Sequence, residues 1–217
     1  MFNSKSVRIS SRVFCMFIYP QIYRRLKRGP QVILPKDIGI LMAYLGICKE
    51  DVGMDAGSGS GWLAVSLGRV CKKVYSYDVR EDFSKIAAHN ARLLGLENIE
   101  FKVGDVTKKI HEKGLDFAIL DLPDSDKALA NVKKALKDNG GVAGYLPHME
   151  QVKKFVMRLG ALGFTDVYTV EVIVRDMLVR KEGVRPSTKG IWHTAYLVFA
   201  RKTTARVAGT AGMRDPK

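Results

Sequence analysis

The segment from Asp55 to Gly61 constrains the fold more than any other part of the chain. It reads Asp-Ala-Gly-Ser-Gly-Ser-Gly and directly follows the short apolar run 52–54. Alternating glycines let the backbone turn tightly after a strand and let a ligand approach without a Cβ in the way. We therefore expect a strand, a ligand-binding turn and a helix, which is how an open α/β sheet begins.

A second acidic residue, Asp78, ends the apolar segment 73–78, about 20 positions after the loop. A carboxylate at the tip of the second strand can accept hydrogen bonds from both ribose hydroxyls of a nucleoside-bearing cofactor. The spacing Gly-x-Gly-x-Gly differs from the Gly-x-Gly-x-x-Gly of dinucleotide-binding loops, whose pyrophosphate needs a longer turn and a helix N-terminus. The pattern favours S-adenosylmethionine over a dinucleotide.

The rest of the chain alternates apolar strands with helices at the spacing of crossover connections. This alternation predicts an α/β fold with a doubly wound, mostly parallel sheet. Helices are expected at 38–45, 62–67, 81–94, 127–136 and 149–162, and strands at 13–19, 52–55, 73–78, 99–103, 117–121 and 141–146. The β-rich stretches 167–178 and 193–200 have no helix between them, so we expect an antiparallel pair at the end of the sheet.

Charge is distributed unevenly along the chain. Its 217 residues, enough for one α/β domain, include 36 Lys and Arg against 22 Asp and Glu, a formal net charge of +14. Charge of this sign attracts polyanions, above all nucleic acid, although a chain can also be basic for solubility alone. A basic cluster at 24–28 and an acidic stretch at 115–126 favour an enzyme that holds a phosphate backbone around a chemical site.

Cysteine and histidine spacing predicts neither a metal site nor a disulfide framework. Cys15, Cys48 and Cys71 are far apart, and the four histidines are isolated. This usage is typical of a reducing cytoplasm. The apolar run 13–19 is too short to span a bilayer and has no small-residue cleavage site of a signal peptide.

Four acidic residues are expected at one edge of the sheet. Asp55, Asp78, Asp105 and Asp121 each stand at or just after the end of an expected strand, and ligands bind at the carboxyl ends of strands in such sheets. Asp78 would hold the ribose, and Asp105 would accept a hydrogen bond from the cofactor's adenine amine. Asp121 would face a neighbouring substrate pocket. Each one alone is also compatible with capping a loop.

Several stretches resemble one family, the tRNA adenine-N1 methyltransferases that act on the T-loop. The stretches are Arg28-Gly-Pro-Gln31, Leu34-Pro-Lys-Asp37, Asp55–Leu63, Ser76–Phe83, Leu120-Asp-Leu-Pro123, Glu150-Gln-Val152, Arg185-Pro186 and His193–Leu197. The resemblance covers residues 16–202. Its glycine loop is common to all class I methyltransferases. Far more specific to this family is the combination of Arg-Gly-Pro-Gln, Leu-Asp-Leu-Pro and the Arg-Pro to His-Thr stretches.

The resemblance implies a cytoplasmic, homotetrameric class I methyltransferase with a Rossmann-like sheet. It would use S-adenosylmethionine to methylate N1 of adenine 58 of tRNA, with adenine 57 left open as a second target. The implied cofactor contacts are Gln31, Gly57, Gly59, Ser60, Gly61, Trp62, Leu63, Asp78, Phe83, Asp105 and Asp121. The candidate substrate contacts are Tyr145, His193 and Arg185. Phe83, Tyr145 and His193 are equally compatible with the core.

The resemblance also sets the expected domain boundaries. Family members usually have a separate N-terminal β domain, where this chain has only residues 1–30, a short basic extension. The methyltransferase domain is expected at 31–202, and residues 203–217, which lack apolar periodicity, are expected to be a disordered tail. The second motif has Asp78 where the family more often has Glu, a shorter carboxylate that still reaches a ribose.

Asp121 is the candidate catalytic residue. A carboxylate that accepts from the adenine N6 amine would orient the base, raise the nucleophilicity of N1 and stabilise the cationic product. Its alternative role is to cap the turn at Pro123. Because N1 is buried in folded tRNA, the base would have to be flipped out. Candidate phosphate contacts are Arg24, Arg25, Lys27, Arg28, Arg175, Arg180, Lys181 and Arg185.

Two alternatives remain at this stage. One is a small-molecule methyltransferase of the corrinoid-precursor type, which shares the glycine loop. The Leu120-Asp-Leu-Pro123 motif argues against it, because a group that stabilises cationic adenine has no role there. The other is a non-catalytic tRNA-binding subunit, in which the intact glycine loop, Asp78 and Asp121 would have no use.

Overall fold

The computed structural model describes residues 21–29 and 31–203 of the chain. The expected strand at 13–19 and the expected tail beyond Thr203 lie outside these residues. Within the described ranges, none of the helices is both long enough and apolar enough to cross a membrane.

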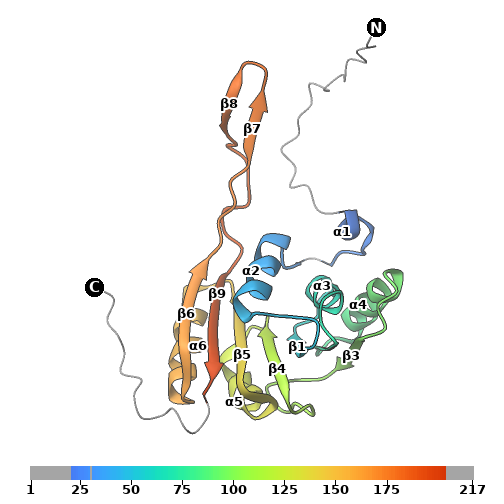
Figure 1. The fold of residues 1–217 in the computed structure, drawn as a ribbon, viewed down its shortest axis with the longest axis vertical. Helices are drawn as coiled ribbons and strands as arrows, with labels where there is room; N and C mark the ends of the chain where they lie inside the picture. Colours follow the sequence, from blue (N-terminus) through green and yellow to red (C-terminus); the bar gives the residue numbers. More distant parts are fainter. Residues whose placement is uncertain (1–20, 30, 204–217) are drawn as a thin grey trace, which may run out of the picture.

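A seven-stranded sheet forms the centre of the molecule, in the order β3-β2-β1-β4-β5-β9-β6 (Figure 1). Its strands are β1 (Val52–Ala56), β2 (Lys73–Asp78), β3 (Ile99–Val103), β4 (Leu115–Leu120), β5 (Leu136–Leu146), β6 (Phe164–Glu171) and β9 (Tyr196–Lys202). Strands β1 to β5 are parallel, while β9 is antiparallel to both β5 and β6. The doubly wound, mostly parallel sheet is therefore confirmed. The strand order reverses between β1 and β4, which is where such sheets bind ligands.

Helices cover both faces of the sheet. They are α1 (Gln21–Arg25), α2 (Pro35–Leu45), α3 (Trp62–Gly68), α4 (Glu81–Leu93), α5 (Ser125–Ala135) and α6 (Met149–Ala161). Apolar residues of α2 and α3, such as Leu41 and Leu67, pack with Phe117 of β4 in one core cluster. Those of α5 and α6, such as Leu129 and Phe155, belong to a second cluster.

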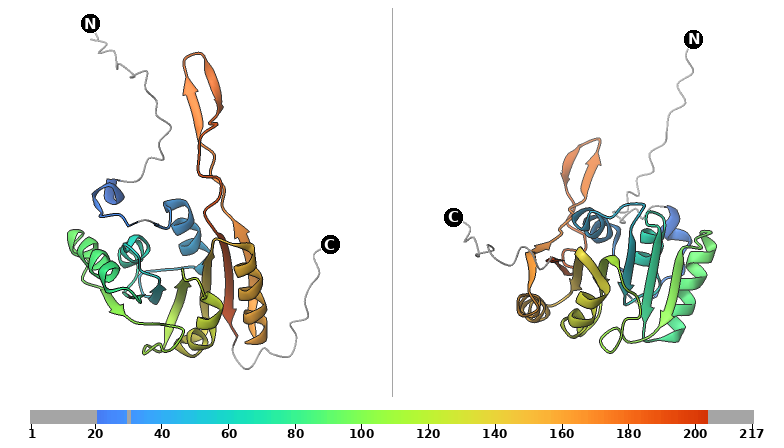
Figure 2. Two further views of the ribbon diagram at one scale, coloured as in Figure 1. Left: turned by 180° about the vertical axis from the view of Figure 1, so that it is seen from behind. Right: turned by 60° about the horizontal axis from the view of Figure 1, so that its bottom comes forward.

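The C-terminal strands differ from the prediction in their bounds, and the strand expected at 193–200 begins at Tyr196. Strands β6 and β9 pair antiparallel as expected, but the expected strand 167–178 is broken after Glu171. Strands β7 (Met177–Arg180) and β8 (Gly183–Pro186) form a separate two-stranded sheet. We call residues 172–194 the arm, and Figures 1 and 2 show it standing clear of the central sheet. The apolar sequence continues through the break, so its local pattern could not reveal where the chain leaves the sheet.

Candidate active site

The glycine loop after β1 has the backbone geometry that its sequence predicts. Gly57, Gly59 and Gly61 have φ angles of 96°, 49° and 80°, all in the region that favours glycine. A Cβ on Gly57 would lie 2.1 Å from the carbonyl oxygen of Asp121, and one on Gly61 would lie 2.8 Å from Ala87 Cβ. A Cβ on Gly59 would meet nothing closer than 4.0 Å. The outer two glycines therefore allow close packing, while Gly59 has room where a Cβ would lie.

Asp78 shapes this loop from the end of β2. Its Oδ2 accepts the backbone N–H of Gly59 at 2.9 Å, and its Oδ1 accepts that of Arg80 at 3.0 Å. The Asp78 side chain is nearly buried and also lies 3.6 Å from the Arg80 guanidinium. Each carboxylate oxygen accepts further hydrogen bonds readily, so Asp78 both holds the loop and remains available to ribose hydroxyls.

Asp55 lies behind the loop rather than facing a ligand. The Ser76 hydroxyl donates to its Oδ2 at 2.8 Å, and Ser76 also contacts the Ser58 hydroxyl at 2.6 Å. The second oxygen, Oδ1, is buried without a hydrogen-bond partner among the described residues. Burial raises the pKa of Asp55 to about 7, and the negative charge of Asp78 contributes. Of the four expected acids, Asp55 is the one that lines neither of the two cavities beside the loop.

A first cavity, of about 190 Å³, opens beside the loop and brings Asp78 and Asp105 together. Asp105 Oδ1 accepts the hydroxyl of Thr107 at 2.6 Å and its backbone N–H at 2.9 Å, which holds the pKa of Asp105 below its usual value. The Tyr77 ring also lines this cavity, and its hydroxyl donates to Glu112 at 2.5 Å. Sequence reasoning missed Tyr77, because it reads as an ordinary buried strand position.

A second cavity, of about 260 Å³, brings three predicted residues together from distant parts of the chain. Gln31 comes from the segment before α2, Asp121 from the end of β4 and Tyr145 from β5. The remaining lining residues, which sequence reasoning did not assign to this pocket, are Arg28, Val32, Leu34, Pro147, Ile191 and Thr194. Two of these belong to the arm, so the arm contributes to the wall of the cavity.

Asp121 lies between the glycine loop and the second cavity. Its backbone N–H donates to the Ala56 carbonyl at 2.8 Å, and its own carbonyl lies against Gly57. Burial, together with the nearby charges of Asp55 and Asp78, raises the pKa of Asp121 to about 7. Its neighbour Leu122 lines the first cavity. The expected position of Asp121 at the strand edge, facing a second pocket, matches this geometry.

Six of the residues implied as cofactor contacts line neither cavity, namely Gly59, Ser60, Gly61, Trp62, Leu63 and Phe83. Trp62 is buried and stacks on Tyr23 with ring centroids 4.9 Å apart. Leu63 belongs to the core cluster of α2 and α3. The Phe83 ring packs beneath the Arg80 guanidinium, which lies 3.6 Å from the ring centroid. Trp62 and Leu63 thus belong to core clusters, while Phe83 is only partly buried.

Ser60 has a distinctive environment inside the loop. Its hydroxyl is buried and has no hydrogen-bond partner among the described residues. Its backbone carbonyl accepts from the Asn90 amide at 2.8 Å, and that amide also donates to the Lys27 carbonyl. Asn90 thus ties the loop to the segment that follows α1.

His193 and Arg185 lie outside the two cavities. His193 Nδ1 is 2.6 Å from Glu171 Oε1, and its Nε2 is 2.9 Å from the Pro147 carbonyl oxygen. Both partners only accept hydrogen bonds, so the ring is fully paired when it is protonated, and Glu171 accordingly raises the pKa of His193. Arg185 is exposed on β8. His193 therefore fixes the base of the arm.

The candidate phosphate contacts lie in two groups. Arg24, Arg25, Lys27 and Arg28 follow or belong to α1, and Arg28 lines the second cavity. Arg175, Arg180, Lys181 and Arg185 lie on the arm, where Arg175 also covers the Trp192 ring at 5.5 Å. No cluster of three or more His, Cys, Asp or Glu within residues 21–29 and 31–203 is arranged to hold a metal ion.

Comparison with known proteins identifies the family. Residues 13–191 match the family described as the tRNA methyltransferase complex GCD14 subunit. A Methanocaldococcus jannaschii protein named tRNA (adenine(57)-N(1)/adenine(58)-N(1))-methyltransferase TrmI is 39% identical over 210 residues, covering 83% of this chain and 74% of that protein.

Two solved structures share the fold over most of their length. The tRNA (m1A58) methyltransferase TrmI of Aquifex aeolicus is 30% identical with a TM-score of 0.79, covering 85% of this chain and 75% of that one. A SAM-dependent O-methyltransferase of Thermotoga maritima is 32% identical with a TM-score of 0.81, covering 87% and 73%. The family match over 13–191, together with the glycine loop and the doubly wound sheet, shows that this chain belongs to the GCD14/TrmI family of class I tRNA methyltransferases.

Proposed function

We propose that this chain transfers a methyl group from S-adenosylmethionine to N1 of adenine 58 in the T-loop of tRNA. The family match and the names of the relatives support this substrate. The observation that carries the proposal is the position of Asp121, which contacts the glycine loop through its backbone and borders the second cavity. A carboxylate there stands beside both the donor side and the acceptor side of a transfer.

The residues around the first cavity fit the donor. Asp78 and Asp105 are the candidates to hold its ribose and adenine, and the open space above Gly59 leaves room for a close backbone approach. Gln31 is the candidate to close over the methionine end from the second cavity. When bound, S-adenosylmethionine supplies a methyl group that is already activated on a sulfonium. The task of the protein is then mainly to position the acceptor.

The second cavity fits a purine base with a polar edge. Asp121 and Tyr145 provide polar groups, and Val32, Leu34 and Pro147 provide apolar walls. As a carboxylate, Asp121 would accept from the N6 amine, which orients N1 and stabilises the positive charge that the adenine gains. Burial and neighbouring acids hold the pKa of Asp121 at about 7, because the protein supplies few groups that stabilise its negative charge. A positive charge that develops on the base would therefore interact strongly with the Asp121 carboxylate.

Access of the base requires that it leave the folded tRNA. Flipping costs a few kcal/mol, which phosphate contacts and pocket contacts offset. The two basic groups, after α1 and on the arm, are the proposed phosphate contacts, with Arg28 at the cavity itself. We propose residues 31–202 as the methyltransferase domain and the basic segment before it as part of the tRNA-binding surface.

The alternatives are less well supported by the site. A corrinoid precursor is a large polycarboxylate, whereas the second cavity measures about 260 Å³ and, among the described residues that line it, has Arg28 as its one Lys or Arg. A non-catalytic subunit would have no use for a loop whose Gly59 is kept open beside Asp78 and Asp121.

The arm supports the proposed homotetramer. Met177, Val179 and Val184 are 54%, 68% and 62% exposed on β7 and β8. An isolated two-stranded sheet is marginally stable in water, and exposed apolar side chains on it favour contact with another protein surface. We propose that the surface is supplied by other copies of this chain.

The substrate is tested by incubating the protein with S-adenosylmethionine and unmodified tRNA transcript, followed by digestion to nucleosides. We expect 1-methyladenosine from the wild-type transcript and none from one with guanosine at position 58. Product that persists with the altered transcript would move the target to position 57. Absence of product from both, with intact cofactor binding, would overturn the tRNA proposal.

A further inference from the structure

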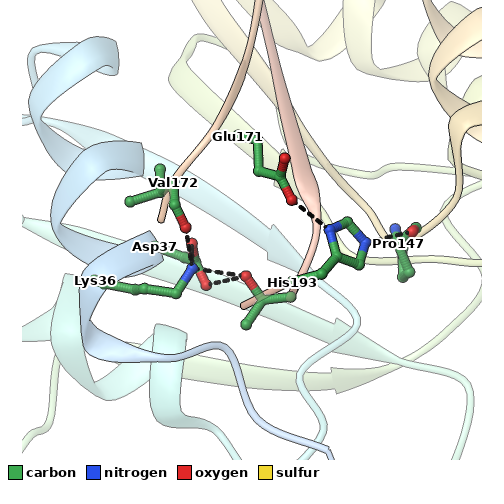
Figure 3. Close-up of polar contacts among 7 residues, drawn as sticks. Lys36, Asp37, Pro147, Glu171, Val172 and His193 are labelled. Carbon is green, nitrogen blue, oxygen red and sulfur yellow. Dashed lines mark hydrogen bonds and ion pairs between the residues drawn. The ribbon is translucent and has the colours of Figure 1, made fainter. Parts of the chain in front are cut away.

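Two of the family-like stretches, Leu34–Asp37 and His193–Leu197, contact each other through a buried polar network (Figure 3). The Lys36 ammonium donates to Asp37 Oδ1 at 2.8 Å, to the Val172 carbonyl at 2.7 Å and to Thr194 Oγ1 at 2.8 Å. The Thr194 hydroxyl in turn donates to Asp37 Oδ2 at 2.9 Å. The network therefore joins the first turn of α2 to both ends of the arm.

Burial makes the hydrogen bonds of this network costly to break. The side chains of Lys36 and Asp37 are 4% and 0% exposed. Buried charges persist only when they are paired and their remaining hydrogen-bonding capacity is satisfied. All three donors of the ammonium and both carboxylate oxygens of Asp37 are engaged here. Movement of any member would leave a buried charge or donor without a partner.

The network adjoins the second cavity through Thr194. Thr194 lines that cavity together with Asp121 and Tyr145. Burial raises the pKa of Tyr145, the charges of Asp37 and Asp121 raise it further, and the Thr194 hydroxyl acts in the opposite direction. Asp37 and Thr194 thus lie close enough to Tyr145 to influence its hydroxyl electrostatically.

A second set of contacts fixes the arm at the same place. His193 bridges Glu171, the last residue of β6, and the carbonyl of Pro147, another lining residue of the second cavity. Figure 3 shows His193 and the Lys36–Asp37 pair gathered around the chain segments that lead into and out of the arm. The base of the arm and one wall of the cavity therefore form a single hydrogen-bonded unit.

We propose that Thr194 is a positioning residue for methyl transfer, held by the buried Lys36–Asp37 pair so that its hydroxyl fixes the arm-side wall of the second cavity. The proposal rests on the proposed function, because the cavity is taken as the site of the target adenine. Thr194 acts through Tyr145 and the wall and takes no part in bond making. Its consequence is that the arm and the acceptor pocket keep one fixed geometry.

The test compares Thr194→Val, which keeps the shape but removes the hydroxyl, with Thr194→Ser, which keeps the hydroxyl. The matched control is Thr203→Val, which removes a similar hydrogen bond, to Thr165 at 2.9 Å, beyond the opposite end of β9. Each variant is assayed for kcat and for KM of tRNA and of S-adenosylmethionine. Hydrogen exchange of backbone amides in segments 143–148, 172–176 and 191–196 is measured on the same samples without substrate.

We expect Thr194→Val to lower kcat at least tenfold, with KM for S-adenosylmethionine within about twofold, because this change leaves the donor cavity intact. Exchange in the three segments should rise at least tenfold. Thr194→Ser should restore both quantities to within about threefold, and Thr203→Val should match wild type. Wild-type kcat in Thr194→Val, or equal losses in the Val and Ser variants, would overturn the positioning role.

Failure of the proposed function is distinguishable from failure of this inference. If the wild-type protein transfers no methyl group to tRNA, the function fails, and the exchange data still report whether the Thr194 hydroxyl holds the wall. Unchanged exchange in Thr194→Val would overturn the inference whatever the activity. Should Thr194→Val unfold, Asp37→Asn replaces it, and unchanged exchange at 191–196 in that variant would equally overturn the inference.

Discussion

At the scale of single residues, Asp121 occupies the proposed catalytic position, and its negative charge lowers the stability of the folded protein. Burial and two neighbouring carboxylates raise its pKa from 3.8 to about 7, so the folded protein disfavours the charge that the proposed reaction needs. For an acid whose folded pKa is raised, this penalty is absent below the unfolded pKa. It grows as pH rises from 3.8 toward 7 and is complete above 7.

We therefore predict that Asp121→Asn stabilises the cofactor-free protein at pH 8. The three-unit shift sets an upper limit, and solvent at the cavity reduces it to about 2 kcal/mol in the free energy of unfolding. The gain should shrink as pH falls and vanish near pH 4. Denaturant unfolding of both proteins at several pH values measures it. A variant that is less stable than wild type at pH 8 would show that Asp121 instead serves as a structural cap.

The position of Asp121 was predictable from sequence, but its protonation behaviour was not. The end of an apolar strand in an open α/β sheet predicts a ligand-facing carboxylate. The pKa shift depends on Asp55 and Asp78, which come from β1 and β2 and approach it only in the folded sheet. The side chains of Trp62 and Leu63 belong to core clusters, and the motif that contains them did not reveal this packing.

At the scale of elements, the glycine loop separates packing from ligand access. A Cβ on Gly57 would lie 2.1 Å from a backbone oxygen of Asp121. A Cβ on Gly59 would have two carbonyl oxygens at 4.0 Å as its nearest neighbours. A backbone oxygen cannot move away from the added Cβ as the end of a flexible side chain can. The two glycines therefore have different reasons to be glycine, although both have positive φ.

We predict that Gly57→Ala destabilises the protein by about 3 kcal/mol, because steric overlap adds to backbone strain, and that Gly59→Ala costs about 1 kcal/mol from strain alone. Both should weaken binding of S-adenosylhomocysteine at least tenfold, Gly59→Ala by filling the open space. Thermal unfolding and calorimetric titration measure the two effects.

The control for this pair is Gly39→Ala in α2, where a Cβ meets nothing within 4 Å. It should gain about 0.5–1 kcal/mol from helix propensity and bind normally. Gly59→Ala with unchanged binding would remove the loop from the donor site.

The break in the C-terminal strand marks the limit of local prediction at this scale. Apolar residues continue from β6 into the arm, so the pattern predicted one strand over 167–178. In the structure the Val172 carbonyl accepts from Lys36, a residue 136 positions away in sequence, and β9 pairs only as far as Glu171. A contact at that separation leaves no trace in the local pattern, and the same holds for the hydrogen bonds of Thr194.

At the scale of the whole molecule, the arm is the feature that the single chain leaves uncovered. We predict that the wild-type protein has a mass several times 24.2 kDa in solution. Replacing Val179 and Val184 with lysine should lower that mass, since two charges would have to be buried in an apolar contact. The turn variant Lys181→Ala should leave it unchanged. Light scattering measures the mass at about 10 μM, a concentration at which stable homo-oligomers persist. A wild-type mass equal to that of one chain would contradict the arm's proposed role in assembly.

The most direct test of the account is single-turnover methyl transfer to unmodified tRNA by wild type and Asp121→Asn, with enzyme in excess and S-adenosylmethionine saturating. The account predicts a transfer rate at least 100-fold lower in the variant, with affinities for tRNA and S-adenosylhomocysteine within about threefold of wild type. Transfer by Asp121→Asn at the wild-type rate would contradict the account. A rate loss that follows lost tRNA affinity would also contradict it, because Asp121 would then bind substrate without stabilising the transfer.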